Sequence, residues 1–137
     1  MLAMRAVLSL LLLVWVCHAN ASDPDPITAQ ASVINWLELL DQAKYEDTWE
    51  SAAPVFKEAL SAKQWARAAG SARKPLGTLV SRELIGTQYR NELPGVPEGD
   101  YVIFQFKSSF EKRNEVIETV TPTLVEGHWR VSGYYVR

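Results

Sequence analysis

The sequence is poor in the residues that build disulfides and zinc sites. Its 137 residues include one cysteine, Cys17, and two histidines, His18 and His128. One cysteine cannot close an intrachain disulfide, and a structural zinc site needs about four ligands of the thiolate or imidazole type. We therefore expect no metal, and a fold that depends on its hydrophobic core for stability.

An excess of positive charge and the common catalytic motifs are also missing. Fourteen Lys and Arg against sixteen Asp and Glu give a net charge of −2, so no basic field is available to hold a nucleic-acid backbone. The chain contains no G-x-G-x-x-G, G-x-x-x-x-G-K-[ST], H-E-x-x-H or G-x-S-x-G motif. We expect no nucleic-acid partner and no cofactor, and the sequence assigns no catalytic residue.

Long apolar runs are absent as well. The longest, at residues 6–17, is too short to cross about 30 Å of hydrocarbon as a helix. It follows Arg5 and precedes residues 19–21, which read Ala-Asn-Ala, with small residues at the two positions that a signal peptidase reads. This pattern predicts a secretory signal over residues 1–21, cleaved after Ala21, and an exported protein, periplasmic or secreted, that is not an integral membrane protein.

Two alternatives to a cleaved signal are weaker. An uncleaved membrane anchor would need a longer apolar run. A lipoprotein modified at Cys17 would need a small residue in place of the bulky Val16. Cleavage after Ala21 removes Cys17 and His18 from the mature chain.

The mature chain begins with a polar lead, residues 22–26, followed by one domain over residues 27–137. In residues 27–43 apolar side chains recur at steps of three and four, which predicts an amphipathic helix with Asp25 as its cap and Pro26 in its first turn. Further helices are expected over residues 45–53, from residue 54, and from Ser61 to about residue 72. Gln64 follows Ser61 at the spacing of a capping box.

The second half of the chain has the pattern of strands. Turn-forming residues separate four β-rich segments, at residues 78–90, 101–110, 115–125 and 128–136. Helices followed by sequential strands predict an α+β fold, with N-terminal helices packed on a curved four-stranded antiparallel sheet.

The strand pattern also predicts which residues face the core. A tight turn at residues 126–127 would pair Val125 with His128 and continue that register along both strands. The apolar face would then include Glu118 and its cross-strand neighbour Tyr135, with Tyr134 on the surface. On the preceding strand, Val102, Phe104 and Phe106 belong on the core face as well. A three-residue loop at 111–113 would achieve this by placing Phe106 opposite Glu118.

A carboxylate on an apolar face costs several kcal/mol unless it is paired, hydrogen-bonded or hydrated. Glu118 is therefore either a structural residue or a pocket carboxylate that acts as a general base or ligand anchor. A structural Glu118 would be half of a buried ion pair, with Arg82 or Arg73, or would lie at the ragged edge of the sheet near the C-terminus. Arg73 and Lys74 are either a helix C-terminal charge pair or an anion site. The tryptophans are either core residues or ligand-stacking platforms. The candidate binding residues are Glu118, Tyr135, Arg73, Arg82, Trp36 and Trp49.

Several segments together resemble a bacterial secreted family named only as domain of unknown function 4019. They are N-W-L-E-L-L-D (35–41), K-Y-E-D-T-W (44–49), R-K-P-L-G (73–77), L-P-G-V-P-E-G-D-Y (93–101) and W-R-V-S-G-Y-Y (129–135). The resemblance covers essentially all of residues 27–137 and implies no activity. The order of helices and strands also resembles the nuclear-transport-factor-2-like or ketosteroid-isomerase-like cone, a fold that hosts enzymes and binding modules alike.

Three functions are compatible with these features. The first is a non-enzymatic module that binds a small molecule or a protein partner in the concavity between helices and sheet. The second is a small enzyme with Glu118 as its general base. The third is a structural interaction protein without a pocket. The ligand or partner and the oligomeric state are not encoded in any recognisable pattern.

Overall fold

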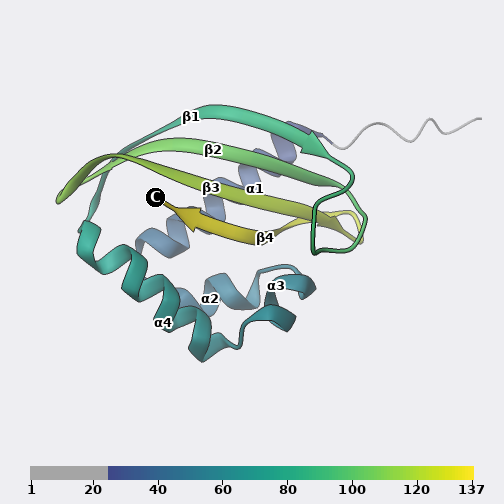
Figure 1. The fold of residues 1–137 in the computed structure, drawn as a ribbon, viewed down its shortest axis with the longest axis horizontal. Coiled ribbons are helices and arrows are strands. Elements are labelled where there is room, and N and C mark those ends of the chain that lie inside the picture. Colours follow the sequence, from purple (N-terminus) through teal and green to yellow (C-terminus); the bar gives the residue numbers. More distant parts are fainter. Residues whose placement is uncertain (1–24) are drawn as a thin grey trace, which may run out of the picture.

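The computed structural model describes residues 25–137 and has an α+β fold (Figure 1). The predicted signal, residues 1–21, lies outside the described residues. The helices are α1 (Pro26–Asp41), α2 (Tyr45–Glu50), α3 (Pro54–Ala59), α4 (Ala62–Arg73) and a short 3₁₀ turn, η1 (Lys74–Leu76). The strands are β1 (Leu79–Arg90), β2 (Tyr101–Phe110), β3 (Arg113–Val125) and β4 (His128–Val136).

The four strands form one antiparallel sheet in the order β1-β2-β3-β4, which confirms the predicted meander. The sheet curves over the helices, so that one of its faces is covered (Figure 1). Helix α1 contacts β2, β3 and β4, whereas α2 and α4 pack against each other. The N–H of Ala53 donates to the carbonyl of Val131 at 2.8 Å, which ties the segment between α2 and α3 to the edge strand β4.

Two of the helices begin with the caps that the sequence predicts. The Asp25 side chain accepts a hydrogen bond from the Ile27 N–H at 2.9 Å, with Pro26 in the first turn of α1. Ser61 and Gln64 form a complete capping box at the start of α4. These bonds satisfy N–H groups that have no partner within a helix.

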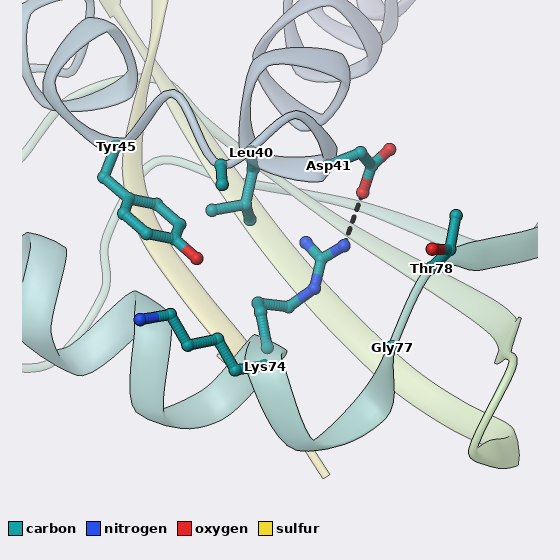
Figure 2. A pocket seen from close by; sticks show the side chains of 8 residues that line it. Leu40, Asp41, Tyr45, Lys74, Gly77 and Thr78 are labelled. Atoms are coloured by element: carbon teal, nitrogen blue, oxygen red, sulfur yellow. Dashed lines mark hydrogen bonds and ion pairs between the residues drawn. The ribbon is translucent and has the colours of Figure 1, made fainter.

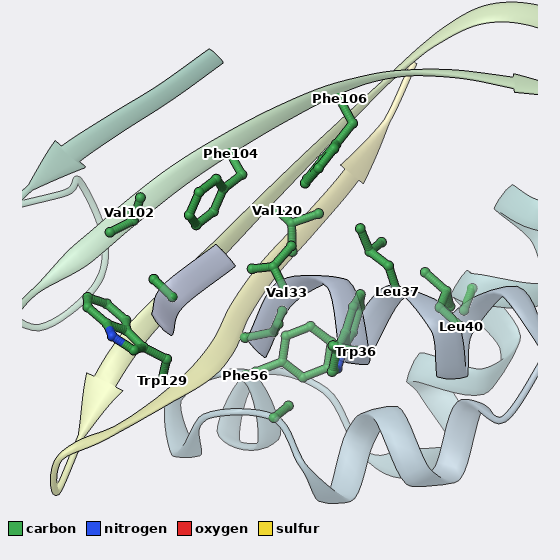
Figure 3. Close-up of a cluster of buried hydrophobic side chains, with 14 of the residues drawn as sticks. Val33, Trp36, Leu37, Leu40, Phe56, Val102, Phe104, Phe106, Val120 and Trp129 are labelled. Carbon is green, nitrogen blue, oxygen red and sulfur yellow. The ribbon is translucent and has the colours of Figure 1, made fainter. Parts of the chain in front are cut away.

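The space between helices and sheet is occupied by a hydrophobic core (Figure 3). Apolar residues of α1 face aromatic and β-branched residues of β2, β3 and β4. The labelled members are Val33, Trp36, Leu37, Leu40, Phe56, Val102, Phe104, Phe106, Val120 and Trp129. The sequence placed Val102, Phe104 and Phe106 on the core face, and the structure confirms this.

The register between β2 and β3 sets Phe106 opposite Glu118, as predicted, but not through a three-residue loop. The turn is tighter, because Phe110 already pairs with Arg113. Between that pair and the next one, Ser108 with Val116, β3 contains one residue more than β2. This extra residue compensates for the shorter turn and restores the predicted register. The prediction for the turn was wrong and the prediction for the register was right.

A second irregularity lies in the hairpin between β3 and β4. The strands follow the predicted register from the turn as far as Pro122, which pairs with Val131. The next pair is Thr121 with Gly133, so Ser132 is an extra residue on β4. Proline has no N–H for a ladder hydrogen bond and is found in sheets at edges or bulges. The Ser132 hydroxyl donates to the Thr121 carbonyl at 2.7 Å within this bulge.

The bulge exchanges the faces of two consecutive tyrosines. Beyond it Tyr134 lies on the core side, whereas the Tyr135 side chain is 73% exposed. The prediction that Tyr135 points inward beside Glu118 was therefore wrong, because one inserted residue reverses every side chain that follows it in a strand.

Candidate functional site

Glu118 is a fully buried carboxylate on β3. One of its oxygens, Oε1, accepts hydrogen bonds from Ser108 Oγ at 2.6 Å and from Arg82 Nε at 2.8 Å. The other, Oε2, accepts from the Tyr134 hydroxyl at 2.6 Å. Burial of this charge is tolerable because both oxygens have donors and one donor is a cation.

Glu118 belongs to a group of four charged residues, Asp41, Arg73, Arg82 and Glu118, which we call the charge quartet. Arg82 binds Asp41 through two parallel bonds, Nη1 to Oδ2 at 2.8 Å and Nη2 to Oδ1 at 2.9 Å. Arg73 Nη2 lies 2.6 Å from the same Asp41 Oδ1, and Arg73 Nη1 lies 3.9 Å from Glu118 Oε2. Two anions and two cations leave the quartet neutral.

The quartet shifts the pKa values of Asp41, Arg82 and the neighbouring Tyr134. Burial alone would raise the pKa of the Asp41 carboxyl, but the hydrogen bonds and charges of Arg82 and Arg73 hold it below its ordinary value. Burial alone would lower the pKa of Arg82, but Asp41 and Glu118 raise it. Burial and the charge of Glu118 raise the pKa of Tyr134. Asp41 therefore stays ionised, and Arg82 and Tyr134 keep their protons, at neutral pH.

Arg73 is the member of the quartet with unused hydrogen-bonding capacity. It ends α4, its side chain is 7% exposed, and its guanidinium lies 4.8 Å from the centre of the Phe110 ring. Its Nε and Nη1 atoms are buried and have no hydrogen-bond partner among the described residues. Buried donors without partners are rare in proteins, because each one loses its hydration without a replacement.

A pocket of about 190 Å³ opens beside Arg73, where α1 ends and the chain enters β1. We call it the Arg73 pocket. Tyr45 and Lys74 lie on one side of it, and Asp41 and Thr78 lie on the other (Figure 2). Its lining residues are Leu40, Asp41, Ala43, Tyr45, Arg73, Lys74, Gly77 and Thr78.

Three of the residues singled out in the sequence meet in the quartet. Arg73 and Arg82 both reach Glu118, so the two alternatives for its ion-pair partner are both present. Tyr135 lies on the opposite face of the sheet and takes no part.

The two candidate tryptophans are packed among the helices. Trp36 is 3% exposed and donates from Nε1 to the Thr48 carbonyl at 2.9 Å. Trp49 donates from Nε1 to the Leu60 carbonyl at 2.7 Å.

Sequence reasoning missed other members of the site. Asp41 lies four residues after Leu37 and continues the apolar stripe of α1, so a carboxylate on that stripe was an available signal. Tyr134 was missed because the bulge at Ser132 could not be seen. No comparable signal marks Ser108.

The described residues contain no group of three or more His, Cys, Asp or Glu side chains that could hold a metal ion. Residues 25–137 also include no helix long and apolar enough to cross a membrane.

The protein is an α+β protein whose helices pack on one face of an antiparallel meander. The buried charge quartet links these helices to the sheet. The family described as "Protein of unknown function (DUF4019)" matches residues 32–134, which is most of the chain, and the protein belongs to that family. The match covers the quartet and the Arg73 pocket completely. A search of the curated proteins finds no match.

Proposed function

We propose that this protein is an exported, non-enzymatic module that binds a small molecule in the Arg73 pocket. The observation that carries the proposal is an open pocket that contains the buried Arg73 guanidinium in its wall and is lined by the side chains of Tyr45, Lys74 and Thr78, whose polar groups have no partner among the described residues. Ligand sites combine such a hollow with a few polar groups that lack partners in the protein.

The environment of Glu118 argues against the enzymatic alternative. A general base must come within hydrogen-bond reach of the proton that it removes. The Glu118 side chain has no exposed surface, and its oxygens accept three hydrogen bonds. Asp41 likewise uses both oxygens on arginines. These carboxylates suit a structural role better than proton transfer.

We propose a ligand position at the end of the helix–sheet layer rather than within it, because the layer itself is filled by the core. Side chains such as Trp36, Phe104 and Phe106 occupy the space under the sheet (Figure 3). The Arg73 pocket lies outside this packed region. The curved sheet with helices on one face supports a relation to the nuclear-transport-factor-2-like cone at the level of architecture.

The binding proposal is tested with the mature protein, starting at Ser22, incubated with a small-molecule extract and analysed by native mass spectrometry. We expect a retained mass in the wild type that is lost in a Tyr45→Phe/Lys74→Ala double variant. A Lys63→Ala variant, altered at an exposed lysine near the other end of α4, should retain it. No retained mass, or equal retention in the double variant, would overturn the proposal. A chemically converted extract component would favour the enzymatic alternative instead.

Export is the second part of the proposal and rests on the sequence of residues 1–21. N-terminal sequencing of the protein from the producing cell should give Ser22 as the first residue. An intact Met1 would contradict it.

A further inference from the structure

We propose that the Arg73 pocket binds a small monocarboxylate. This inference rests on the proposed function and adds the chemical class of the ligand. It also favours an anion site over a helix C-terminal charge pair as the role of Arg73 and Lys74.

The charges around the pocket favour one negative charge. The quartet itself is neutral, and Lys74 adds one cation at the pocket wall. Asp41 is the only carboxylate among the lining residues, and it already accepts bonds from Arg73 and Arg82. Glu111 and Lys112, whose side chains flank Gly77 behind the pocket wall, add one charge of each sign. A ligand with one negative charge would balance the single unmatched cation, whereas a dianion would exceed it.

Each free hydrogen-bonding group of the pocket can donate, and the Lys74 ammonium can only donate. The hydroxyls of Tyr45 and Thr78 and the ammonium of Lys74 make no hydrogen bond or ion pair with the described residues. Arg73 contributes its charge from within the wall rather than through an exposed atom. Carboxylate oxygens are the natural partners of such donors, because a carboxylate accepts and does not donate.

Lys74 and Tyr45 both lie against Gly70 at the pocket rim. A Cβ atom at Gly70 would lie 3.6 Å from Lys74 Cε and 3.8 Å from Tyr45 Cε2, so both side chains pass over this glycine. The pocket wall also includes Leu40 and Ala43, which offer apolar contact. A volume of about 190 Å³ therefore suits a carboxylate on a short hydrocarbon chain.

The test uses isobutyrate, its neutral isostere isobutyramide and inorganic phosphate, each titrated into the mature protein at constant ionic strength. Binding is followed by the backbone amide resonances of the pocket residues Ala43, Gly77 and Thr78. We expect saturable shifts with isobutyrate and none with isobutyramide. Lys74→Gln should weaken isobutyrate binding by up to about fivefold, the loss of one exposed charge–charge contact. Lys63→Gln, on the same helix, should leave it unchanged.

The outcomes separate this inference from the proposed function. Equal binding of isobutyramide, tighter binding of phosphate, or no binding of isobutyrate would overturn the carboxylate assignment. A neutral ligand recovered from the extract and lost in the Tyr45→Phe/Lys74→Ala variant would overturn it too, while leaving the proposed function in place. A carboxylic acid recovered from the extract with the same dependence on Lys74 would support both.

Discussion

Glu118 is a carboxylate that meets no water and yet has a donor for each of its oxygens. Its partners come from β1, β2 and β4, so this one side chain joins every strand of the sheet to the β3 strand on which it lies. A group so placed contributes to stability only as long as its charge remains, because the cations around it are buried as well.

The substitution Glu118→Gln keeps the shape of the side chain and removes its charge. Arg82 would then be buried with Asp41 as its only anion, and the new amide group would face the donors of Ser108 and Tyr134. We expect a loss on the order of 3–5 kcal/mol in the free energy of unfolding, the usual result of breaking a buried pair. A urea titration measures it, and unchanged or increased stability would show that the charge is not needed.

The two consecutive tyrosines provide a matched pair. Tyr134→Phe removes a hydroxyl that donates to Glu118 at 2.6 Å, and we expect a loss of about 1.5–3 kcal/mol, as for hydrogen bonds to charged groups. Tyr135→Phe removes an exposed hydroxyl and should change stability by less than about 0.5 kcal/mol. Urea midpoints of both variants check the expectation. A larger loss for Tyr135→Phe than for Tyr134→Phe would indicate that the strands pair without the bulge.

Among the elements, α1 ends in an unusual way. The N–H of Lys44 donates to the Leu39 carbonyl and that of Ala43 to the Leu40 carbonyl, the two bonds of a Schellman motif. The left-handed residue of this motif is usually glycine, but here it is Ala43, with φ of 56°. An alanine in this conformation is strained by its Cβ.

We expect Ala43→Gly to raise the free energy of unfolding by about 0.5–1 kcal/mol, the relief of strain less the added freedom of the unfolded chain. The control is Ala31→Gly, at an exposed position inside the same helix, which should lower stability by about 1 kcal/mol. Thermal unfolding measures whether each substitution raises or lowers the stability of the protein. Two losses of equal size would mean that Ala43 is not strained.

The elements themselves were predictable because their signals are local. The caps at Asp25 and Ser61 and the turn before His128 depend on neighbours in sequence, and each is present. The bulge at Ser132 was not predictable, because its cause involves Pro122 on the neighbouring strand. The same limit applies to Asp41, whose two arginine partners lie 32 and 41 residues away.

At the scale of the whole molecule, the quartet links stability to pH. The pKa of Asp41 is lowered in the folded state, so its contribution is fully present above the ordinary pKa of about 3.9 and is lost as the pH falls below it. The raised pKa of Tyr134 has the opposite sense, since its contribution is complete below the ordinary tyrosine pKa of about 10 and is lost above it.

Urea titrations between pH 7 and pH 3 test the loss of stability expected at acid pH. We expect the wild type to lose stability below about pH 4, and Asp41→Asn to lose less over the same range because its side chain does not titrate. Glu38→Gln, at an exposed carboxylate on the same helix, should keep the wild-type slope. If the unfolding free energies of the wild type and Asp41→Asn fell equally with pH, the loss of stability at acid pH would come from other carboxylates.

The ion pairs of the quartet close loops of 32, 36 and 41 residues and bring α1, α4, β1 and β3 into one orientation. Such contacts need the finished arrangement of these elements, so we expect them to form after the folding transition state. Glu118→Gln should then accelerate unfolding and leave the refolding rate nearly unchanged, as stopped-flow measurements in urea would show. Slower refolding would instead place Glu118 in the folding nucleus. By this reasoning the quartet governs how long the folded state lasts rather than how quickly it is reached.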